Sequence, residues 1–257
     1  MSTRRLLTTP VIDIRRVSKE LVHNGKKVLC LKDISFSVHE NEFISIVGPS
    51  GCGKSTFLRI LMGLMPPTSG EVIYKGERVC GVNPHMSMVF QSFALFPWLN
   101  VVENVELGLE AQHVPKEQRR KRALSIIQEV GLEGFEDAFP RELSGGMKQR
   151  VGLARALVTD PEILLMDEPF SNLDPLIAEG LREEILRLWS DKATLPEIVI
   201  MVSHNVEEAV YLSDRVIVFS QRPGTVLAEF DVDIVRPRDK RSQELYKLVD
   251  RITSLIA

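Results

Sequence analysis

The chain has 257 residues, of which 44% are hydrophobic, and a formal net charge of −3 at pH 7. This length suits one large domain, or one domain with a subdomain, and it allows a sizeable core to be buried. The small net charge gives no basic field that would favour nucleic acid or anionic lipid, and no segment approaches the ~20 apolar residues of a membrane-spanning helix.

Cysteine usage and the first residues bear on the cellular compartment. Cys30, Cys52 and Cys80 are odd in number, and one of them lies inside a glycine-rich loop. This usage favours a reducing compartment over a disulfide scaffold. Residues 1–10 have no apolar core, so they predict no signal peptide. Any role at a membrane would therefore need a separate partner chain.

The first part of the chain predicts antiparallel strands. Apolar and polar side chains alternate in segments 11–14, 31–38 and 71–74. Asn24-Gly25, between the first two segments, is typical of a hairpin turn, and Lys75-Gly76 follows the third. We therefore expect a small antiparallel sheet beside the buried strand predicted at 43–47.

A glycine-rich loop follows that strand. It reads Gly48-Pro49-Ser50-Gly51-Cys52-Gly53-Lys54-Ser55-Thr56 and matches the phosphate-binding pattern G-x-x-x-x-G-K-[ST]. Glycines bring backbone N–H groups against a phosphate, Lys54 supplies charge for the β- and γ-phosphates, and the Ser55 hydroxyl can hold Mg²⁺. A chance glycine-rich turn is the alternative. The strand before the loop and the helix predicted at 57–62 argue against it.

The strand predicted at 86–90 ends at Gln91, and an aromatic stretch follows at 92–99. Two interpretations of these rings stay open: ordinary core packing, or an apolar groove for a partner helix. Helices are predicted at 101–112 and 116–130, as a helical insertion without strands. We expect the basic run 119–122 within it to be a solvated face.

Three further segments carry candidate chemistry. Ser144-Gly145-Gly146 opens a helix and forms a possible second anion site, although this pattern alone is common. Residues 163–168 predict a buried strand ending in Asp167, placed to hold Mg²⁺ through water, and Glu168, placed to polarise a water molecule. An ordinary turn is the alternative. The strand at 198–202 ends near His204, which is either a γ-phosphate sensor or a structural histidine.

The last part of the chain predicts a hairpin and a helix. Strands at 215–219 and 225–230 flank the turn Arg222-Pro223-Gly224. Residues 242–257 predict an amphipathic helix that packs back onto its own domain, with a dimer contact as the second interpretation. We expect the basic run 236–241 to be solvated.

Taken together, these motifs resemble the ATP-binding subunit of ABC transporters over roughly residues 11–235. The resemblance identifies a Walker A loop at 48–55, a Q-loop glutamine at Gln91, a signature at 143–147, a Walker B strand at 163–167 with Glu168 as the catalytic carboxylate, a D-loop at 171–174 and a switch histidine at His204. Segments 206–215 and 220–224 look more narrowly like the nitrate/sulfonate/taurine importer group.

The resemblance implies an α/β fold: a RecA-like P-loop NTPase core with a parallel sheet, an antiparallel β subdomain and a helical subdomain. The nucleotide-binding domain would span 11–235, with the helical subdomain at approximately 92–158, and 236–257 would form a tail. Catalytic roles fall on Glu168, His204, Lys54 and Gln91. ATP would contact residues 48–56, Ser144, Gly145, Gly146 and Asp174, and Mg²⁺ would be held by Ser55, Gln91 and Asp167.

The implied function is ATP hydrolysis that powers import of a small solute. The active unit would be a head-to-tail homodimer in which Ser144 and its glycines close over the ATP of the other copy. Two membrane permease subunits would dock near Phe93–Trp98, a separate binding protein would deliver solute, and the chain would lie peripherally on the cytoplasmic face of the inner membrane. No nucleic acid partner is expected.

Alternatives stay open at this point. They are an ATPase for lipid transport or another ABC system, a soluble ABC ATPase without a transporter, and a nucleotide-binding scaffold, against which Glu168 and His204 argue. The sequence does not reveal the solute or the role of the last helix.

Some positions depart from the family pattern. Leu21, with His23 nearby, stands where an aromatic ring usually stacks on adenine, Asn172 replaces a small residue, and Asn205 replaces Asp. Because Cys52 lies near a helix N-terminus, we also expect it to be a reactive thiol that ATP protects.

Overall fold

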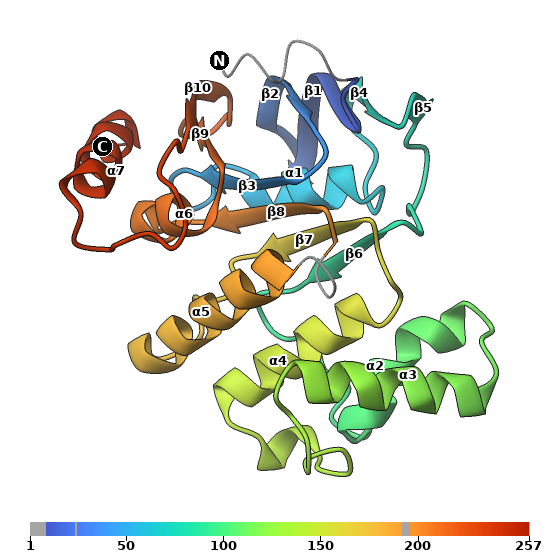
Figure 1. Ribbon diagram of the computed structural model, residues 1–257. Helices are drawn as coiled ribbons and strands as arrows, with labels where there is room; N and C mark the ends of the chain where they lie inside the picture. Colours follow the sequence, from blue (N-terminus) through green and yellow to red (C-terminus); the bar gives the residue numbers. More distant parts are fainter. Residues whose placement is uncertain (1–8, 24, 192–195, 257) are drawn as a thin grey trace. The chain divides into compact units, whose positions relative to one another are not determined.

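The computed structural model describes residues 9–23, 25–191 and 196–256. The chain forms two compact units: residues 1–83 with 198–257, and residues 84–197 (Figure 1). The predictions for the first eight residues and for Asn24 lie outside the described part. Within that part, no helix is long and apolar enough to cross a membrane.

The first unit contains the predicted antiparallel sheet. Its strands are β1 (Ile12–His23), β2 (Lys26–Val38), β4 (Ser69–Tyr74) and β5 (Glu77–Arg78), in the order β2-β1-β4-β5. Every pairing is antiparallel. Gly25, at the turn between β1 and β2, has a φ of 74°, which glycine adopts without strain. The alternating pattern thus predicted both the strands and their pairing.

A second set of strands in this unit carries the glycine-rich loop. They are β3 (Glu42–Val47), β8 (Ile198–Ser203), β9 (Arg215–Phe219) and β10 (Val226–Asp231), in the order β10-β9-β3-β8. Strand β3 is buried along its whole length and runs parallel to β8 and β9. Strands β9 and β10 form the predicted hairpin. Helices α1 (Lys54–Leu61), α6 (Val206–Leu212) and α7 (Gln243–Ile256) complete the unit.

The second unit is mainly helical. Strands β6 (Met86–Val89) and β7 (Ile163–Asp167) pair in parallel. The helices are α2 (Val101–Ala111), α3 (Lys116–Glu129), α4 (Gly145–Leu157) and α5 (Pro175–Asp191), with a 3₁₀ turn at Pro140–Glu142. Residues 90–162, all of which the structure describes, contain helices and no strand. The helical insertion therefore forms as expected.

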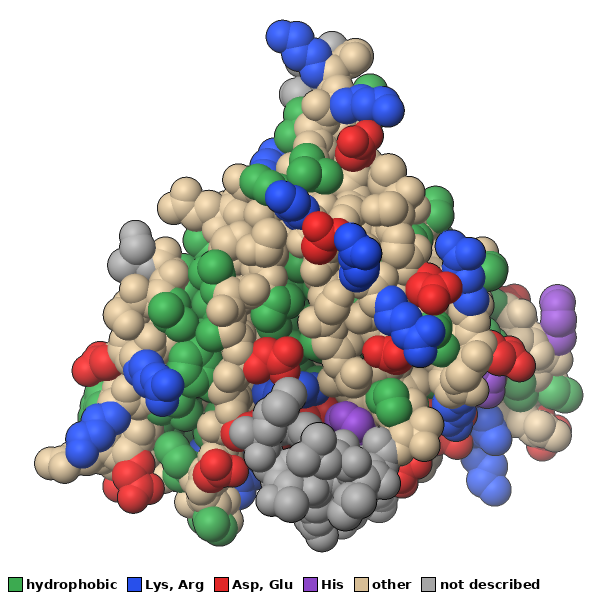
Figure 2. Space-filling model, turned by 90° about the horizontal axis from the view of Figure 1, so that it is seen from above, with side chains coloured by type: hydrophobic (Ala, Val, Ile, Leu, Met, Phe, Trp, Pro, Cys, Tyr) green, Lys and Arg blue, Asp and Glu red, His purple; other side chains and the backbone are tan. Residues whose placement is uncertain are grey.

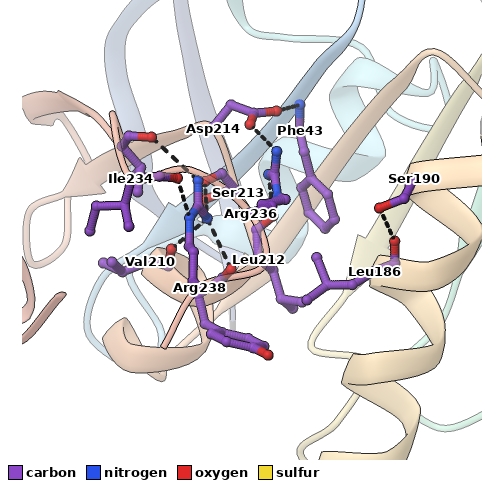
Figure 3. Close-up of polar contacts among 12 residues, drawn as sticks. Phe43, Leu186, Ser190, Val210, Leu212, Ser213, Asp214, Ile234, Arg236 and Arg238 are labelled. Atoms are coloured by element: carbon purple, nitrogen blue, oxygen red, sulfur yellow. Dashed lines mark hydrogen bonds and ion pairs between the residues drawn. The ribbon is translucent and has the colours of Figure 1, made fainter. Parts of the chain in front are cut away.

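The expectation of two solvated basic runs is only partly right. In the run 119–122, Lys121 and Arg122 are exposed. In the run 236–241, however, Arg238 is buried, at 6% exposure, because its guanidinium group donates to backbone carbonyls at the end of α6 (Figure 3). Figure 2 shows Lys and Arg side chains interspersed with Asp and Glu over the face that it draws.

Helix α7 packs on α6 and β9, within its own unit. Leu245 and Ile252 on its apolar face are fully buried, and the guanidinium group of Arg251 lies 5.0 Å from the centre of the Phe230 ring. This contact confirms the favoured interpretation of the amphipathic tail.

A buried ion network lies at the first residue of β3, Glu42. Arg215, 3% exposed, pairs with Glu42 and Glu229 at N–O distances of 3.0 Å each. It also donates to the carbonyl of Ser37, while Glu42 accepts from the backbone N–H of His39 at 2.9 Å. Since a buried charge is costly unless it is paired, each member depends on the others.

Replacing Arg215 with Met should therefore destabilise the protein by about 3 kcal/mol, because Glu42 would stay buried without its cation. Urea unfolding measures the loss. Arg16→Met, at an exposed arginine 4.0 Å from Asp33, is the matched control and should change little. Equal unfolding midpoints for both variants would contradict the network's role.

Candidate functional site

The glycine-rich loop has the backbone that phosphate binding requires. Gly51 and Gly53 have φ values of 76° and 110°, in the left-handed region. A Cβ atom at Gly48 would lie 2.8 Å from the carbonyl oxygen of Phe219, and one at Gly53 would lie 2.7 Å from Leu31 Cδ2. Larger residues at either position would therefore displace the loop. The loop delivers a phosphate to the N-terminus of α1, where backbone N–H groups lack helical partners.

Lys54 folds back along this loop. Its side chain is 4% exposed, and its ammonium group donates to the carbonyls of Gly48 at 2.7 Å and Pro49 at 3.1 Å. Phosphate oxygens would compete for the same donor. The first turn of α1 reads Lys54-Ser55-Thr56-Phe57, without an acidic side chain that would repel an anion.

The prediction that Cys52 is a reactive thiol is wrong. Its side chain is 1% exposed, and its sulfur would lie 3.2 Å from a Cβ atom at Gly48. Burial raises the pKa of the Cys52 thiol, and the nearby charge of Lys54 only partly offsets this effect. The backbone of Cys52 belongs to the loop, but its side chain packs inward, which the sequence does not reveal.

His204 follows β8 directly, at the same edge as the loop. Ser203 pairs with Val47 in the parallel ladder, and Val47 immediately precedes the loop. His204 is exposed, so it is not a histidine of the core. Asn205 then caps α6 by accepting from the backbone N–H of Glu208 at 3.1 Å. Asn is as good an N-cap as Asp, so this departure from the family pattern leaves the local structure intact.

In the second unit, Gln91 and Glu168 come together. The side-chain amide of Gln91 donates to Glu168 Oε2 at 3.3 Å and to Ser171 Oγ at 3.2 Å. Asp167, 5% exposed, ends β7 beside them in sequence. Glu168 has a φ of 45°, an uncommon value that turns its side chain out of the strand direction. Glu168 thus lies within reach of Gln91, and a turn closed by the N–H of Ser171 and the carbonyl of Glu168 follows it.

The D-loop is tied to the same group of residues. Asn172 donates from its side chain to the carbonyl of Gln91 at 2.8 Å, so the departure from a small residue adds a hydrogen bond. Asp174 accepts from the backbone N–H of Ile177 at 3.1 Å, which caps α5. Sequence reasoning missed the contact of Asn172, since nothing in the spacing links it to a residue so far away in the chain.

The tip of α4 is open. Ser144 is exposed and caps the helix by accepting from the backbone N–H of Met147 at 3.3 Å. A Cβ atom at Gly146 would lie 2.4 Å from Ile177 Cγ2, so glycine lets α4 pack closely against α5. A Cβ atom at Gly145 would lie 3.3 Å from Cδ2 of Leu173, in the segment before α5. Ser144, Gly145 and Gly146 therefore form a helix N-terminus at which only Ser144 is exposed, and such an end can attract an anion.

In the aromatic stretch at 92–99, buried or partly buried side chains bind the backbone, while two rings are exposed to solvent. Phe96 and Trp98 are 41% and 69% exposed, and their ring centres lie 5.3 Å apart. Asn104, fully buried, accepts from the backbone N–H of Phe96 at 2.8 Å and donates to its carbonyl at 3.2 Å. Arg155 donates to the carbonyls of Phe93 at 2.9 Å and Ala94 at 2.6 Å. For Phe96 and Trp98, core packing is therefore the wrong interpretation.

The structure does not test the predicted adenine contact or the predicted magnesium ligands. Leu21 is half-buried in β1, opposite Val28, and the side chain of His23 lies outside the described part. Among the described residues, no group of three or more His, Cys, Asp or Glu side chains could hold a metal ion. The predicted magnesium ligands Ser55, Gln91 and Asp167 include a hydroxyl and an amide, so they do not form a group of that kind.

Known proteins match both sequence and fold. The family described as ABC transporter matches residues 31–171. Similar relatives include the nitrate import ATP-binding protein NrtD of Synechocystis, 41% identical over 95% of this chain and 94% of its own, and the taurine import ATP-binding protein TauB of Rhizobium johnstonii, 45% identical over 82% and 80%. The aliphatic sulfonates import ATP-binding protein SsuB of Bacillus thuringiensis is 38% identical over 94% of both chains.

Among solved structures, a dimeric ATP-binding cassette in a post-hydrolysis state with ADP and Pi matches with a TM-score of 0.75 and 33% identity, over 87% of this chain and all of that one. These matches confirm the predicted P-loop fold class and the likeness to the nitrate/sulfonate/taurine group. The chain therefore belongs to the ABC transporter family, as an ATP-hydrolysing subunit.

Proposed function

We propose that two copies of this chain bind ATP head to tail, and that each ATP is hydrolysed by residues from both copies. The observation that carries the proposal is the open tip of α4, where Ser144 is exposed and faces no acidic side chain in its own first turn. The backbone N–H groups of this helix N-terminus would donate to a γ-phosphate. A similar cassette, solved as a dimer with ADP and Pi, supports a dimeric unit.

In one copy, residues 48–56 hold the phosphates. Backbone N–H groups of the loop and the N-terminus of α1 donate to the β- and γ-phosphates, and Lys54 exchanges its carbonyl partners for phosphate oxygens. This exchange moves a buried charge from neutral partners to anionic ones, which strengthens its hydrogen bonds. Asp174 belongs to the proposed nucleotide contacts in addition to its role as the cap of α5. Leu21 would offer adenine an aliphatic contact in place of a stacked ring.

Magnesium fits the donors assigned to it. Ser55, Gln91 and Asp167 offer hydroxyl, amide and carboxylate oxygens, which are the ligands that Mg²⁺ prefers. Because the amide nitrogen of Gln91 already donates to Glu168 and Ser171, its oxygen remains the end suited to a cation. When bound, Mg²⁺ would neutralise phosphate charge.

Glu168 and His204 act on the attacking water. Glu168 accepts a hydrogen bond from that water and polarises it, while Gln91 fixes the direction of its carboxylate. His204, exposed at the end of β8, contacts the γ-phosphate. Closure on ATP and opening after product release would supply the motion that drives transport.

The partners are two membrane permease subunits, each docked on a copy near Phe93–Trp98. Phe96 and Trp98 form an exposed apolar pair on a segment that Asn104 and Arg155 hold in place, so a partner helix would meet a preorganised surface. The chain would then lie peripherally on the cytoplasmic face of the inner membrane, with a separate solute-binding protein on the other side.

The solute is proposed from the relatives, since this subunit would not touch it. Nitrate, taurine and aliphatic sulfonates are small anions or zwitterions, and we assign a solute of that class. The proposed domain boundaries are 11–235 for the nucleotide-binding domain, approximately 92–158 for its helical subdomain and 236–257 for the tail.

Glu168→Gln should lower ATP turnover by about 10²–10³-fold, because the amide cannot polarise the attacking water. Nucleotide binding should persist, and ATP should trap a dimer on size-exclusion chromatography. Glu162→Gln, at a half-buried carboxylate of the same unit that lies 3.2 Å from His85 Nδ1, is the control. Unchanged turnover would remove Glu168 from the reaction.

Ser144→Arg should abolish hydrolysis, since the bulky cation fills the helix tip that meets the other copy's ATP. Binding of a fluorescent ATP analogue to the monomer should stay within about 2-fold. Ser125→Arg, on the exposed surface of α3, is the matched substitution and should leave turnover intact. Full activity of Ser144→Arg would refute a site shared between copies.

Trp98→Ser should weaken recovery of the chain with its permease from detergent-solubilised membranes, because a hot-spot aromatic is worth about 2 kcal/mol or more. Phe135→Ser, at a ring 45% exposed in the same unit, is the control. Equal co-purification of both variants would place the docking surface elsewhere. ATP turnover of the isolated subunit should be the same in both.

A further inference from the structure

The segment 232–238, here called the strap, crosses the carboxyl end of α6 (Figure 3). We propose that Arg236 and Arg238 of the strap are positioning residues that set the place of His204 through α6. This inference rests on the role that the proposed function gives to His204. It assigns a task to a basic run that the sequence alone predicts to be solvated.

The position of helix α6 is set by contacts at its two ends. It has seven residues, which corresponds to about 10 Å of length. A helix this short is unstable by itself, so its position is set by capping and packing. A shift at one end therefore reaches the other, because two turns of helix move as a rigid rod.

His204 lies next to the N-terminus of α6. The Ser203 hydroxyl accepts from the backbone N–H of Asn205 at 3.0 Å and donates to Glu208 at 2.8 Å. Asn205 caps the helix through the N–H of Glu208. His204 lies between these two capping residues, so the direction of its imidazole follows the start of α6.

The strap is bound to the other end. Arg238 Nη1 donates to the carbonyls of Val210 at 2.8 Å, Tyr211 at 2.9 Å and Ser213 at 2.7 Å, and Arg236 Nη2 donates to that of Leu212 at 2.6 Å. The carbonyl of Ala209 accepts from the N–H of Ser213 at 3.0 Å. Val210, Tyr211 and Leu212, the residues of α6 whose carbonyls lie beyond the helical hydrogen bonds, thus all have arginine donors.

The strap itself is anchored to the strand that enters the glycine-rich loop. Arg236 pairs with Asp214, and Asp214 Oδ2 accepts from the backbone N–H of Phe43 at 3.0 Å. The N–H of Asp214 donates to the carbonyl of Phe43 at 2.7 Å. Arg238 also donates to the strap's own carbonyl at Ile234, at 2.9 Å. The arginines therefore fix the position of α6 relative to β3, the strand that leads into the glycine-rich loop.

Charge strengthens this attachment. Burial lowers the pKa of Arg238 to about 10, a value that keeps the guanidinium group charged at neutral pH. A cation at the carboxyl end of a helix is stabilised by the helix dipole. A neutral side chain of the same length would leave the carbonyls of Val210 and Tyr211 without these donors.

The test compares Arg238→Met and Arg238→Lys with Arg251→Met, which removes a tail arginine that lies over Phe230 rather than on α6. Each is measured as the full chain, alone and combined with His204→Ala. For Arg238→Met we expect kcat to fall about 10-fold while KM for ATP changes less than 2-fold, because the reacting groups are misplaced and the loop is not. Arg238→Lys, which keeps the charge, should recover part of kcat, and Arg251→Met should match the native chain.

The double variant separates positioning from general destabilisation. With His204→Ala present, Arg238→Met should lower kcat by less than a further 2-fold, because its effect passes through the missing imidazole. An undiminished 10-fold loss in that background, or an unchanged kcat in Arg238→Met alone, would overturn the proposal. If His204→Ala alone keeps full turnover, the assigned role of His204 fails first, and the positioning role falls with it.

Imidazole NMR signals give a readout that does not depend on turnover. In histidine-labelled protein, the His204 resonance is assigned by its loss in His204→Ala. It should shift in Arg238→Met, and should stay in place in Arg251→Met. If Arg238→Met does not fold, Arg238→Lys carries the same comparison, and an unmoved His204 signal in it would count against the proposal.

Discussion

The close approach of the glycine-rich loop to its neighbours is the constraint on which the site depends. Gly48 lies against the backbone of Phe219, and Gly53 against the side chain of Leu31, so neither position has space for a Cβ atom. This packing fixes where the N-terminus of α1 meets a phosphate. It also brings the ammonium group of Lys54 to the carbonyls of Gly48 and Pro49. Phosphate oxygens can replace these carbonyls as acceptors, because a charged acceptor forms a stronger hydrogen bond.

Helix ends position most of the other functional groups. Ser144 caps α4, Asp174 caps α5 and Asn205 caps α6, and each of these polar residues stands at a point assigned to ATP or next to one. Such ends leave backbone N–H groups that attract anions, and their caps fix the direction of the chain that enters the helix. In α6 the carboxyl end is capped as well, by two arginines from a segment far along the chain. The unpaired backbone groups at helix ends thus serve both to bind phosphate and to position the functional side chains.

The sequence predicted the motifs whose chemistry is local and missed the contacts that the tertiary fold creates. Spacing was enough for the glycine-rich loop, for the strand that ends at Asp167 and for the hairpin around Pro223, because each depends on neighbours in the chain. It was not enough for Cys52, whose position near a helix start suggests reactivity while packing buries its sulfur. Arg238 appeared to be one more solvated charge, since no periodicity marks a residue that reaches carbonyls more than twenty positions away. Asn172 was noted only as a departure, and its hydrogen bond to Gln91 depends on how the second unit folds.

The central claim is that one copy holds only half of each reaction centre. Complementation between two inactive variants tests it most directly, by mixing Ser144→Arg with Lys54→Ala and following ATP turnover. In mixed dimers, one site receives an intact loop from the first variant and an intact helix tip from the second, while the other site carries both lesions. Random pairing should restore about a quarter of native activity, since about half of the dimers are mixed and each has one intact site. A mixture as inactive as its two components would contradict the shared site.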